Sequence, residues 1–181
     1  MLKGKTVVLG VTGCIAAYKA CEIVSSLKKK GATVIVIMTP HSTEFVQPLS
    51  FETLSGNRVI TDLFDRDFDF EVEHVALAKR ADVFVVAPAT ANTIGKIANG
   101  IADDMLTTTI MACKAPKIIC PAMNTNMYEN ENTTENIARL KKQGYKIIEP
   151  ISGRLACGDV GKGKMAEPET IVKAIEDILT P

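Results

Sequence analysis

Thr6-Val-Val-Leu-Gly-Val11 is a short run rich in β-branched residues that ends at Thr12-Gly13. Such a run is typical of a strand that is buried on both faces of a parallel sheet. A helical pattern follows over residues 15–30 and stops at Gly31, a residue type that commonly ends helices. Residues 33–38 repeat the strand pattern. A strand, a helix and another buried strand predict a parallel βαβ unit.

The same alternation continues along the chain. Further strands are predicted at residues 82–87, 116–120 and 145–148, and further helices at 48–54, 75–80, within 88–99, and at 102–113, 133–143 and 169–179. The acidic residues 59–73 are interpreted as a solvated loop. The pattern predicts one α/β domain over residues 1–181, with a doubly wound, mostly parallel sheet flanked by helices, as in Rossmann-like and flavodoxin-like folds.

Composition excludes several classes of protein. Basic and acidic residues both number 21, so the formal net charge is zero, which argues against a nucleic-acid binder driven by bulk charge. No apolar run approaches the roughly 18 residues that a membrane span needs, and no signal peptide precedes the first strand. The five cysteines include no CxxC pair. They argue against a disulfide framework or a metal site and indicate a reducing cytoplasm.

Four unusual loops follow predicted strands, at residues 10–13, 39–40, 88–93 and 121–127. In a doubly wound sheet, ligands bind at the carboxyl ends of the strands, so these loops are expected to converge on one edge. Small residues and hydroxyls beside helix N-termini suit a phosphate and a flat ring. The pair Gly10 and Gly13 is a weak signal alone, because a tight turn explains it equally well. The last two loops carry Asn92 and Asn124, which suit hydrogen bonding to a buried ligand.

A glycine-rich segment at residues 153–165 contains Cys157 and two lysines, Lys162 and Lys164. So many glycines cost conformational entropy on folding, and a long loop of this kind is usually functional. We predict a flexible flap over residues 151–166 that closes on a small ligand. Nearby cations lower the pKa of a thiol and raise its reactivity, although a spare, inert thiol is the alternative interpretation.

His74 follows Glu73 at the start of a predicted helix, and its spacing fits a surface residue and a catalytic residue about equally. His41 is interpreted as a surface residue. The remaining cysteines lie in predicted helices or strands and are interpreted as small core residues, namely Cys14, Cys21, Cys113 and Cys120.

Taken together, five segments resemble the homo-oligomeric flavin-containing cysteine decarboxylases over essentially the whole chain. They stand in the order of that family: Val11-Thr-Gly-Cys-Ile-Ala-Ala-Tyr-Lys19, His74-Val-Ala-Leu-Ala-Lys-Arg-Ala-Asp82, Pro88-Ala-Thr-Ala-Asn-Thr93, Pro121-Ala-Met-Asn-Thr-Asn-Met-Tyr128 and Ala156-Cys-Gly-Asp-Val-Gly-Lys-Gly-Lys-Met165. Two positions depart from the family pattern, since Arg80 and Tyr128 stand where Trp is common. These departures concern local packing and substrate fit.

The resemblance implies an FMN-dependent decarboxylation of 4'-phosphopantothenoylcysteine to 4'-phosphopantetheine in coenzyme A biosynthesis. It would pass through a thioaldehyde and an enethiolate, with FMN as the electron sink that the protein alone lacks. The catalytic residues would be His74 as general base or electrostatic partner, Asn124 as the carboxylate ligand and Cys157 as the proton donor. The implied FMN contacts are Thr12, Gly13, Thr39, Ala89, Thr90, Asn92 and Ala122.

The predicted substrate-binding residues are Asn124, Met127, Lys162 and Lys164. The two lysines are assigned to the substrate phosphate on charge alone, and ordinary solvated lysines are the alternative. The resemblance also implies a homotrimer, or a dodecamer of trimers, with active sites between subunits. Whether a phosphopantothenoylcysteine synthetase domain is fused to this one is left open by the sequence.

Two other functions within the family remain alternatives. A peptidyl-cysteine decarboxylase would share the His and Asn motifs but release the enethiol, so Cys157 argues against it. A non-catalytic regulatory flavoprotein would not need all three catalytic candidates. Outside the family, an electron-carrying flavodoxin-like protein would not need a cysteine flap.

Overall fold

The computed structural model describes residues 1–64, 73–154, 156 and 158–180. Its main sheet has the strand order β2-β1-β3-β4-β5, and every pairing in it is parallel. The strands are β1 Thr6–Val11, β2 Thr33–Met38, β3 Val83–Ala89, β4 Lys117–Pro121 and β5 Lys146–Ile147. The predicted doubly wound α/β fold is confirmed. The strand order reverses at β1 and β3, because the chain adds β2 on one side of β1 and then returns to its other side.

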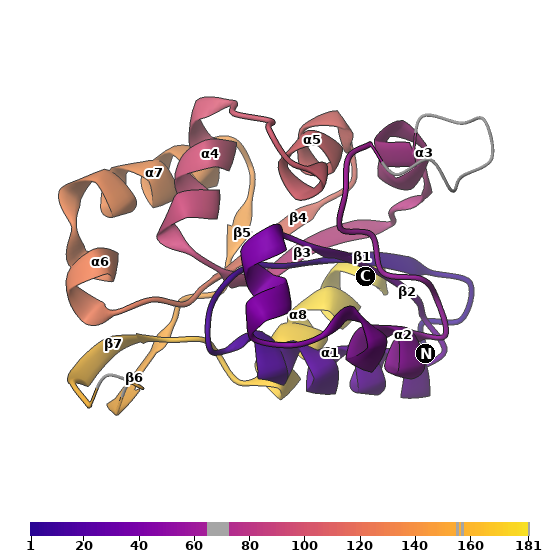
Figure 1. Cartoon of the computed structure of the whole chain (residues 1–181), viewed down its shortest axis with the longest axis horizontal. Helices are drawn as coiled ribbons and strands as arrows, with labels where there is room; N and C mark the ends of the chain where they lie inside the picture. Colours follow the sequence, from indigo (N-terminus) through magenta and orange to yellow (C-terminus); the bar gives the residue numbers. More distant parts are fainter. Residues whose placement is uncertain (65–72, 155, 157, 181) are drawn as a thin grey trace.

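Helices cover both faces of the sheet (Figure 1). One face packs against α1 Ala17–Lys29, α2 Pro48–Ser55 and α8 Pro168–Leu179. The other packs against α3 Glu73–Arg80, α4 Ala91–Asn99, α5 Met105–Ala112 and α7 Glu131–Lys142. Alternate strand residues enter the two aliphatic cores, so that Val7 and Leu9 point into the first and Val8 into the second. Strands β1 to β4 are buried on both faces, as the β-branched runs predict, whereas β5 at the sheet edge is exposed or half-buried.

Two short helices lie inside segments where the sequence predicts a loop or only a helix start. A 3-10 helix spans Pro40–Glu44, and α6 spans Thr125–Glu129 within the predicted loop at residues 121–127. Asn124 caps α6, since its side chain accepts a hydrogen bond from the Asn126 backbone. The helix predicted from residue 102 begins at Met105, because Asp104 and Thr107 form a capping box there.

The two ends of the glycine-rich segment form strands that pair with each other, whereas the sequence predicts a loop over its whole length. Strand β6 Ile151–Arg154 pairs antiparallel with β7 Val160–Lys164. Met165, at the end of this segment, is buried against the α1 side of the sheet. The predicted flap over residues 151–166 stays a prediction.

The acidic stretch also differs from its prediction at its beginning. Ile60 exchanges backbone hydrogen bonds with β2, donating to Val36 and accepting from Met38. Val59 and Ile60 are therefore buried at the sheet edge instead of solvated. Within the described ranges, no helix has the length and apolar character of a membrane span, and no group of three or more potential metal ligands is found.

Candidate functional site

The Thr12 hydroxyl joins the ends of the two strands at which the sheet order reverses. It donates a hydrogen bond to the Pro88 carbonyl at 2.8 Å and accepts one from the Thr90 backbone N–H at 3.1 Å. Thr12 is buried. Its bond to Pro88 is buried as well, and the bond from Thr90 is part-buried. In sheets of this strand order, ligands bind beside the reversal, at the carboxyl ends of the strands.

The neighbouring loops approach the Thr12 bridge closely. Thr39 donates its backbone N–H to the Val11 carbonyl, and Ala122 donates its own to Ala89. At Gly13, a Cβ atom would lie 2.6 Å from the His41 Cβ, so only glycine fits between the two loops. The structure thus brings the loops after β1, β2, β3 and β4 to one edge of the sheet, as the sequence predicts.

The predicted FMN contacts all lie in these loops or beside them. Thr90 caps α4 by accepting a hydrogen bond from the Thr93 N–H, and Asn92 is exposed in the first turn of that helix. The chemistry of the set is hydroxyls, an exposed amide and small side chains at a helix start. That chemistry fits the phosphate and the flat ring of a flavin nucleotide.

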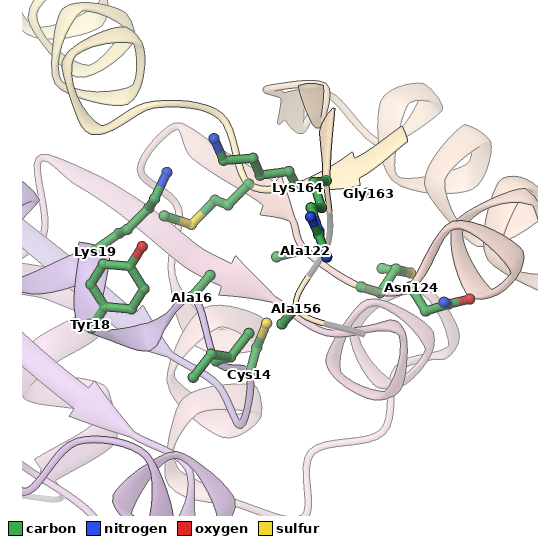
Figure 2. A pocket seen from close by; sticks show the side chains of 13 residues that line it. Cys14, Ala16, Tyr18, Lys19, Ala122, Asn124, Ala156, Gly163 and Lys164 are labelled. Carbon is green, nitrogen blue, oxygen red and sulfur yellow. The ribbon is translucent and has the colours of Figure 1, made fainter. Parts of the chain in front are cut away.

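A cavity of about 350 Å³ opens between the start of α1, the loop after β4 and the β6–β7 hairpin. Figure 2 shows Tyr18 and Lys19 at one end of it and Asn124 at the opposite end. Three predicted site residues line it, namely Ala122, Asn124 and Lys164. Its other lining residues include Cys14, Ala16, Arg154, Ala156 and Gly163. The cavity is mostly apolar, with a few polar groups, as is usual for small-molecule sites.

Three cations line this cavity: Lys19, Arg154 and Lys164. Glu167 pairs with two of them, at 2.7 Å from Lys19 and 3.0 Å from Lys164. Figure 2 shows the amino groups of these two lysines on the same side of the cavity. Hydrogen bonds from Lys19 and then Lys164 lower the pKa of Glu167, so this carboxylate stays ionised at neutral pH. It holds the two ammonium groups close together.

Asn124 is oriented through both atoms of its amide. Its Oδ1 accepts a hydrogen bond from the Asn126 N–H at 2.8 Å, and its Nδ2 donates to Asp159 Oδ2 at 3.2 Å. The first bond fixes Oδ1 as the acceptor and Nδ2 as the donor of this amide. Next to it, the Thr125 hydroxyl oxygen is buried and has no hydrogen-bond partner among the described residues.

Strand β7 lies directly against the Asn124 loop. Met123 donates its N–H to the Gly163 carbonyl at 3.0 Å. A Cβ atom would lie 2.2 Å from the Met123 oxygen at Gly163, and 2.5 Å from the Thr125 hydroxyl oxygen at Gly161. The glycines of this strand therefore allow the hairpin to dock onto the loop that carries Asn124.

Three other predicted residues, His74, Met127 and Lys162, do not line the cavity. His74 is half-buried in the first turn of α3, and Figure 1 shows α3 and α6 at opposite ends of the molecule. Met127 is exposed on α6. Lys162 pairs with Glu149 instead of lining the cavity. Cys157 falls outside the described residues.

Sequence reasoning missed the contribution of residues 14–16, just before α1, and of the first turn of that helix. Cys14 was interpreted as a core residue, but it is half-buried and lines the cavity. Burial raises the pKa of its thiol, against a smaller opposite effect of a hydrogen bond from Ala16, so the thiol is protonated at neutral pH. Ile15 and Tyr18 are large and exposed. Tyr18 lies outside the apolar face of α1, and a large aromatic residue at such a position was the signal available in the sequence.

Comparisons with known proteins agree with this geometry. The model of a family described as Flavoprotein matches residues 1–180. The coenzyme A biosynthesis bifunctional protein CoaBC of Bacillus subtilis (strain 168) is 52% identical over 176 residues, which are 97% of this chain and 43% of the relative. The chain thus spans less than half the length of that relative. A probable phosphopantothenoylcysteine decarboxylase of Streptococcus mutans is 47% identical over 177 residues, 97% of this chain and 99% of the relative.

Solved structures give the same result. A cysteine-to-serine mutant of PPC decarboxylase, complexed with pantothenoylaminoethenethiol, is 34% identical with a TM-score of 0.86 and covers 98% of this chain and 99% of its own. The FMN-binding protein AtHal3 is 35% identical with a TM-score of 0.81, and 96% of each chain is covered. Both confirm the predicted fold.

Proposed function

Because the chain belongs to the flavoprotein family, we propose that it binds FMN and decarboxylates 4'-phosphopantothenoylcysteine to 4'-phosphopantetheine in coenzyme A biosynthesis. The chain would then be a carboxy-lyase, as the names of its relatives indicate for them. One observation carries the proposal: an amide that suits a carboxylate and three cations that suit a phosphate line the same cavity. The apolar lining between them suits the linear body of the substrate.

The FMN site is proposed at the carboxyl ends of β1, β3 and β4. Thr12 and Thr90 stand at the reversal of the strand order, where such sheets bind ligands. The absence of large side chains at Gly13, Ala89 and Ala122 leaves room for a flat ring. When bound, FMN supplies a two-electron acceptor that oxidises the carbon bearing the substrate thiol and later returns the electrons, so that no net oxidation occurs.

Asn124 is proposed to hold the carboxylate that leaves. Its Nδ2 donates to the Asp159 carboxylate, which shows that the amide accommodates this type of acceptor. In the reaction, the substrate carboxylate takes that place. When the C–C bond to CO₂ breaks, its electron pair moves into the neighbouring C=S group and forms an enethiolate. Asn124 contributes by holding the bond in position for this step.

His74 is proposed to reach the site of a second copy of the chain. Helices α3 and α6 lie at opposite ends of one molecule (Figure 1), so a site that needs both His74 and Asn124 requires two subunits. Histidine is a side chain suited to act as a general base near neutral pH. A homotrimer, or a dodecamer of trimers, provides such shared sites by symmetry.

Cys157 is proposed to donate the proton that converts the enethiolate into the saturated thiol as the electrons return from FMN. Its neighbour Ala156 lines the cavity. The solved cysteine-to-serine mutant of PPC decarboxylase holds an enethiol, the species expected when such a proton donor is missing. Cys157→Ser is expected to release CO₂ and accumulate the enethiol, measured by mass spectrometry. Normal yield of the saturated product would remove this role.

The substrate phosphate is proposed to bind Lys164, together with Lys19 and Arg154 of the same cavity. This feature separates the proposed substrate from a peptide ending in cysteine. The experiment compares kcat/KM for 4'-phosphopantothenoylcysteine, its dephosphorylated analogue and a peptide with C-terminal cysteine. Strong preference for the phosphorylated compound supports the proposal, whereas preference for the peptide supports a peptidyl-cysteine decarboxylase.

The proposed compartment is the cytoplasm. The four described cysteines are free thiols, which fits a reducing compartment. A fused phosphopantothenoylcysteine synthetase domain remains part of the proposal, because the CoaBC relative is named as a bifunctional protein and the match covers 43% of its length.

A further inference from the structure

Outside the cavity, Tyr128, Glu149 and Lys162 form a cluster that no step of the proposed reaction uses. The Tyr128 hydroxyl donates to Glu149 Oε2. Lys162 Nζ lies 3.0 Å from the same oxygen and 5.2 Å from the centre of the Tyr128 ring. The ammonium group is therefore held by a carboxylate and by an aromatic face together.

These three residues come from three parts of the fold. Tyr128 lies on α6, Glu149 lies between β5 and β6, and Lys162 lies in the middle of β7. The contacts therefore tie the second strand of the hairpin both to the base of its first strand and to the helix that begins at Asn124. Lys141 of α7 pairs with the other oxygen of Glu149, at 2.7 Å, but does not belong to the hairpin.

The docked strand is the one that positions Asn124. Gly161 and Gly163, on either side of Lys162, lie against Thr125 and Met123, and Met123 donates its N–H to Gly163. The cation of Lys162 is thus anchored midway between the two closest approaches of β7 to the Asn124 loop. Tyr128 is 9% exposed, which makes it a fixed anchor for the more exposed lysine.

We propose that Tyr128, Glu149 and Lys162 act as a latch that holds β7 against the Asn124 loop, so that Lys162 is a positioning residue. The latch rests on the contacts alone, whereas its effect on turnover rests on the proposed decarboxylation. In this assignment Lys162 does not bind the substrate phosphate, which distinguishes it from Lys164.

The Met123 amide proton is a direct reporter, because it exchanges with solvent only when β7 leaves the loop. Lys162→Met keeps the aliphatic stem but loses the ion pair and the cation–π contact, and Tyr128→Phe loses the hydrogen bond to Glu149. Each variant is expected to speed Met123 exchange about three- to tenfold. The Thr39 amide, bonded to Val11, serves as the internal reference and is expected to keep its rate.

Lys141→Met is the matched control, since it removes a cation from the same carboxylate without touching the hairpin. It is expected to leave Met123 exchange close to wild type. In the double variant Lys162→Met with Glu149→Gln, Met123 exchange is expected to be only slightly faster than in the stronger single variant. Both substitutions break the same ion pair between Lys162 and Glu149. Equal acceleration by Lys141→Met, or unchanged Met123 exchange in Lys162→Met and Tyr128→Phe, would overturn the latch.

Kinetics separate positioning from phosphate binding. The latch predicts that Lys162→Met lowers kcat for the phosphorylated and the dephosphorylated substrate by the same factor, with little change in their KM ratio. A selective rise in KM for the phosphorylated substrate would return Lys162 to the phosphate site. If wild-type protein fails to decarboxylate while Met123 exchange responds as described, the latch stands and the proposed function fails.

Discussion

Thr12 Oγ1 and the Thr90 backbone nitrogen lie 3.1 Å apart and share a hydrogen bond that joins the ends of β1 and β3. The same hydroxyl donates to the Pro88 carbonyl. A single buried side chain therefore satisfies a donor and an acceptor at the point where the strand order reverses. This hydroxyl therefore ties together the two loops, after β1 and after β3, that form part of the proposed FMN site.

Thr12→Val tests this link. The shape of the side chain is kept, but the buried Pro88 carbonyl and the part-buried Thr90 N–H lose their partner. This loss costs about 1–3 kcal/mol of unfolding free energy. FMN affinity is expected to fall about tenfold, since each 1.4 kcal/mol is a factor of ten. Denaturant unfolding and FMN fluorescence titration measure both. Thr53→Val is the control, because Thr53 bonds Leu49 on an exposed helix face. Equal losses in both variants would contradict a special role for Thr12.

Gly163→Ala is expected to displace β7 from the Asn124 loop, because its Cβ would lie 2.2 Å from the Met123 oxygen. Overpacking of this kind costs about 1–3 kcal/mol. Turnover is expected to fall at least tenfold with FMN still bound, because Asn124 loses its position. Gly153→Ala on the paired strand is the control, since its Cβ would meet only the Lys164 side chain at 3.7 Å. Wild-type kcat in Gly163→Ala would show that this docking is dispensable.

Two variants that are each expected to be inactive, His74→Asn and Asn124→Asp, are expected to regain activity when their chains assemble in one oligomer. His74→Asn removes the proposed base, and Asn124→Asp keeps the helix cap but repels a carboxylate. If each site takes His74 and Asn124 from different copies, random mixing in a cyclic oligomer gives about one quarter wild-type sites. Co-expressed chains are therefore expected to show about a quarter of wild-type turnover. Mixed oligomers without activity would place both residues in one subunit's site.

Lowering the pH is expected to weaken the contribution of Glu149 to the stability of the folded protein. Burial raises the pKa of this carboxyl, but hydrogen bonds from Lys141, Tyr128 and Lys162 outweigh it and bring the pKa to about 2. A lowered folded-state pKa means stability that is present above the unfolded value near 4.5 and lost as pH falls toward 2. The stability difference between wild type and Glu149→Gln should therefore shrink between those pH values. A difference that stays constant with pH would mean that the charge contributes nothing.

The strands and the location of the site were predictable because each depends on local sequence. The β-branched runs identified all five strands of the main sheet, and the parallel βαβ rule placed Thr12, Thr39 and Ala122 at one edge. By contrast, the β6–β7 hairpin was hidden, since Gly161 and Gly163 weaken the strand pattern. Their reason for being glycine is the close approach to Thr125 and Met123, a tertiary contact.

The cations of the cavity were hidden for a different reason. Lys19 and Lys164 are brought together by Glu167, and lysines so far apart in sequence carry no signal of their proximity. The separation of His74 from Asn124 within one chain is likewise a property of helix placement (Figure 1). The sequence motifs predict both residues as catalytic, but only the fold shows that one copy does not unite them.

The most direct test is to saturate the purified chain with FMN, confirm binding by the visible flavin spectrum, and incubate it with 4'-phosphopantothenoylcysteine. Mass spectrometry then follows the substrate. The expected product has lost one CO₂ and is the saturated thiol 4'-phosphopantetheine, with the flavin oxidised again at the end. Substrate that is recovered unchanged from the flavin-loaded protein would contradict the proposed function.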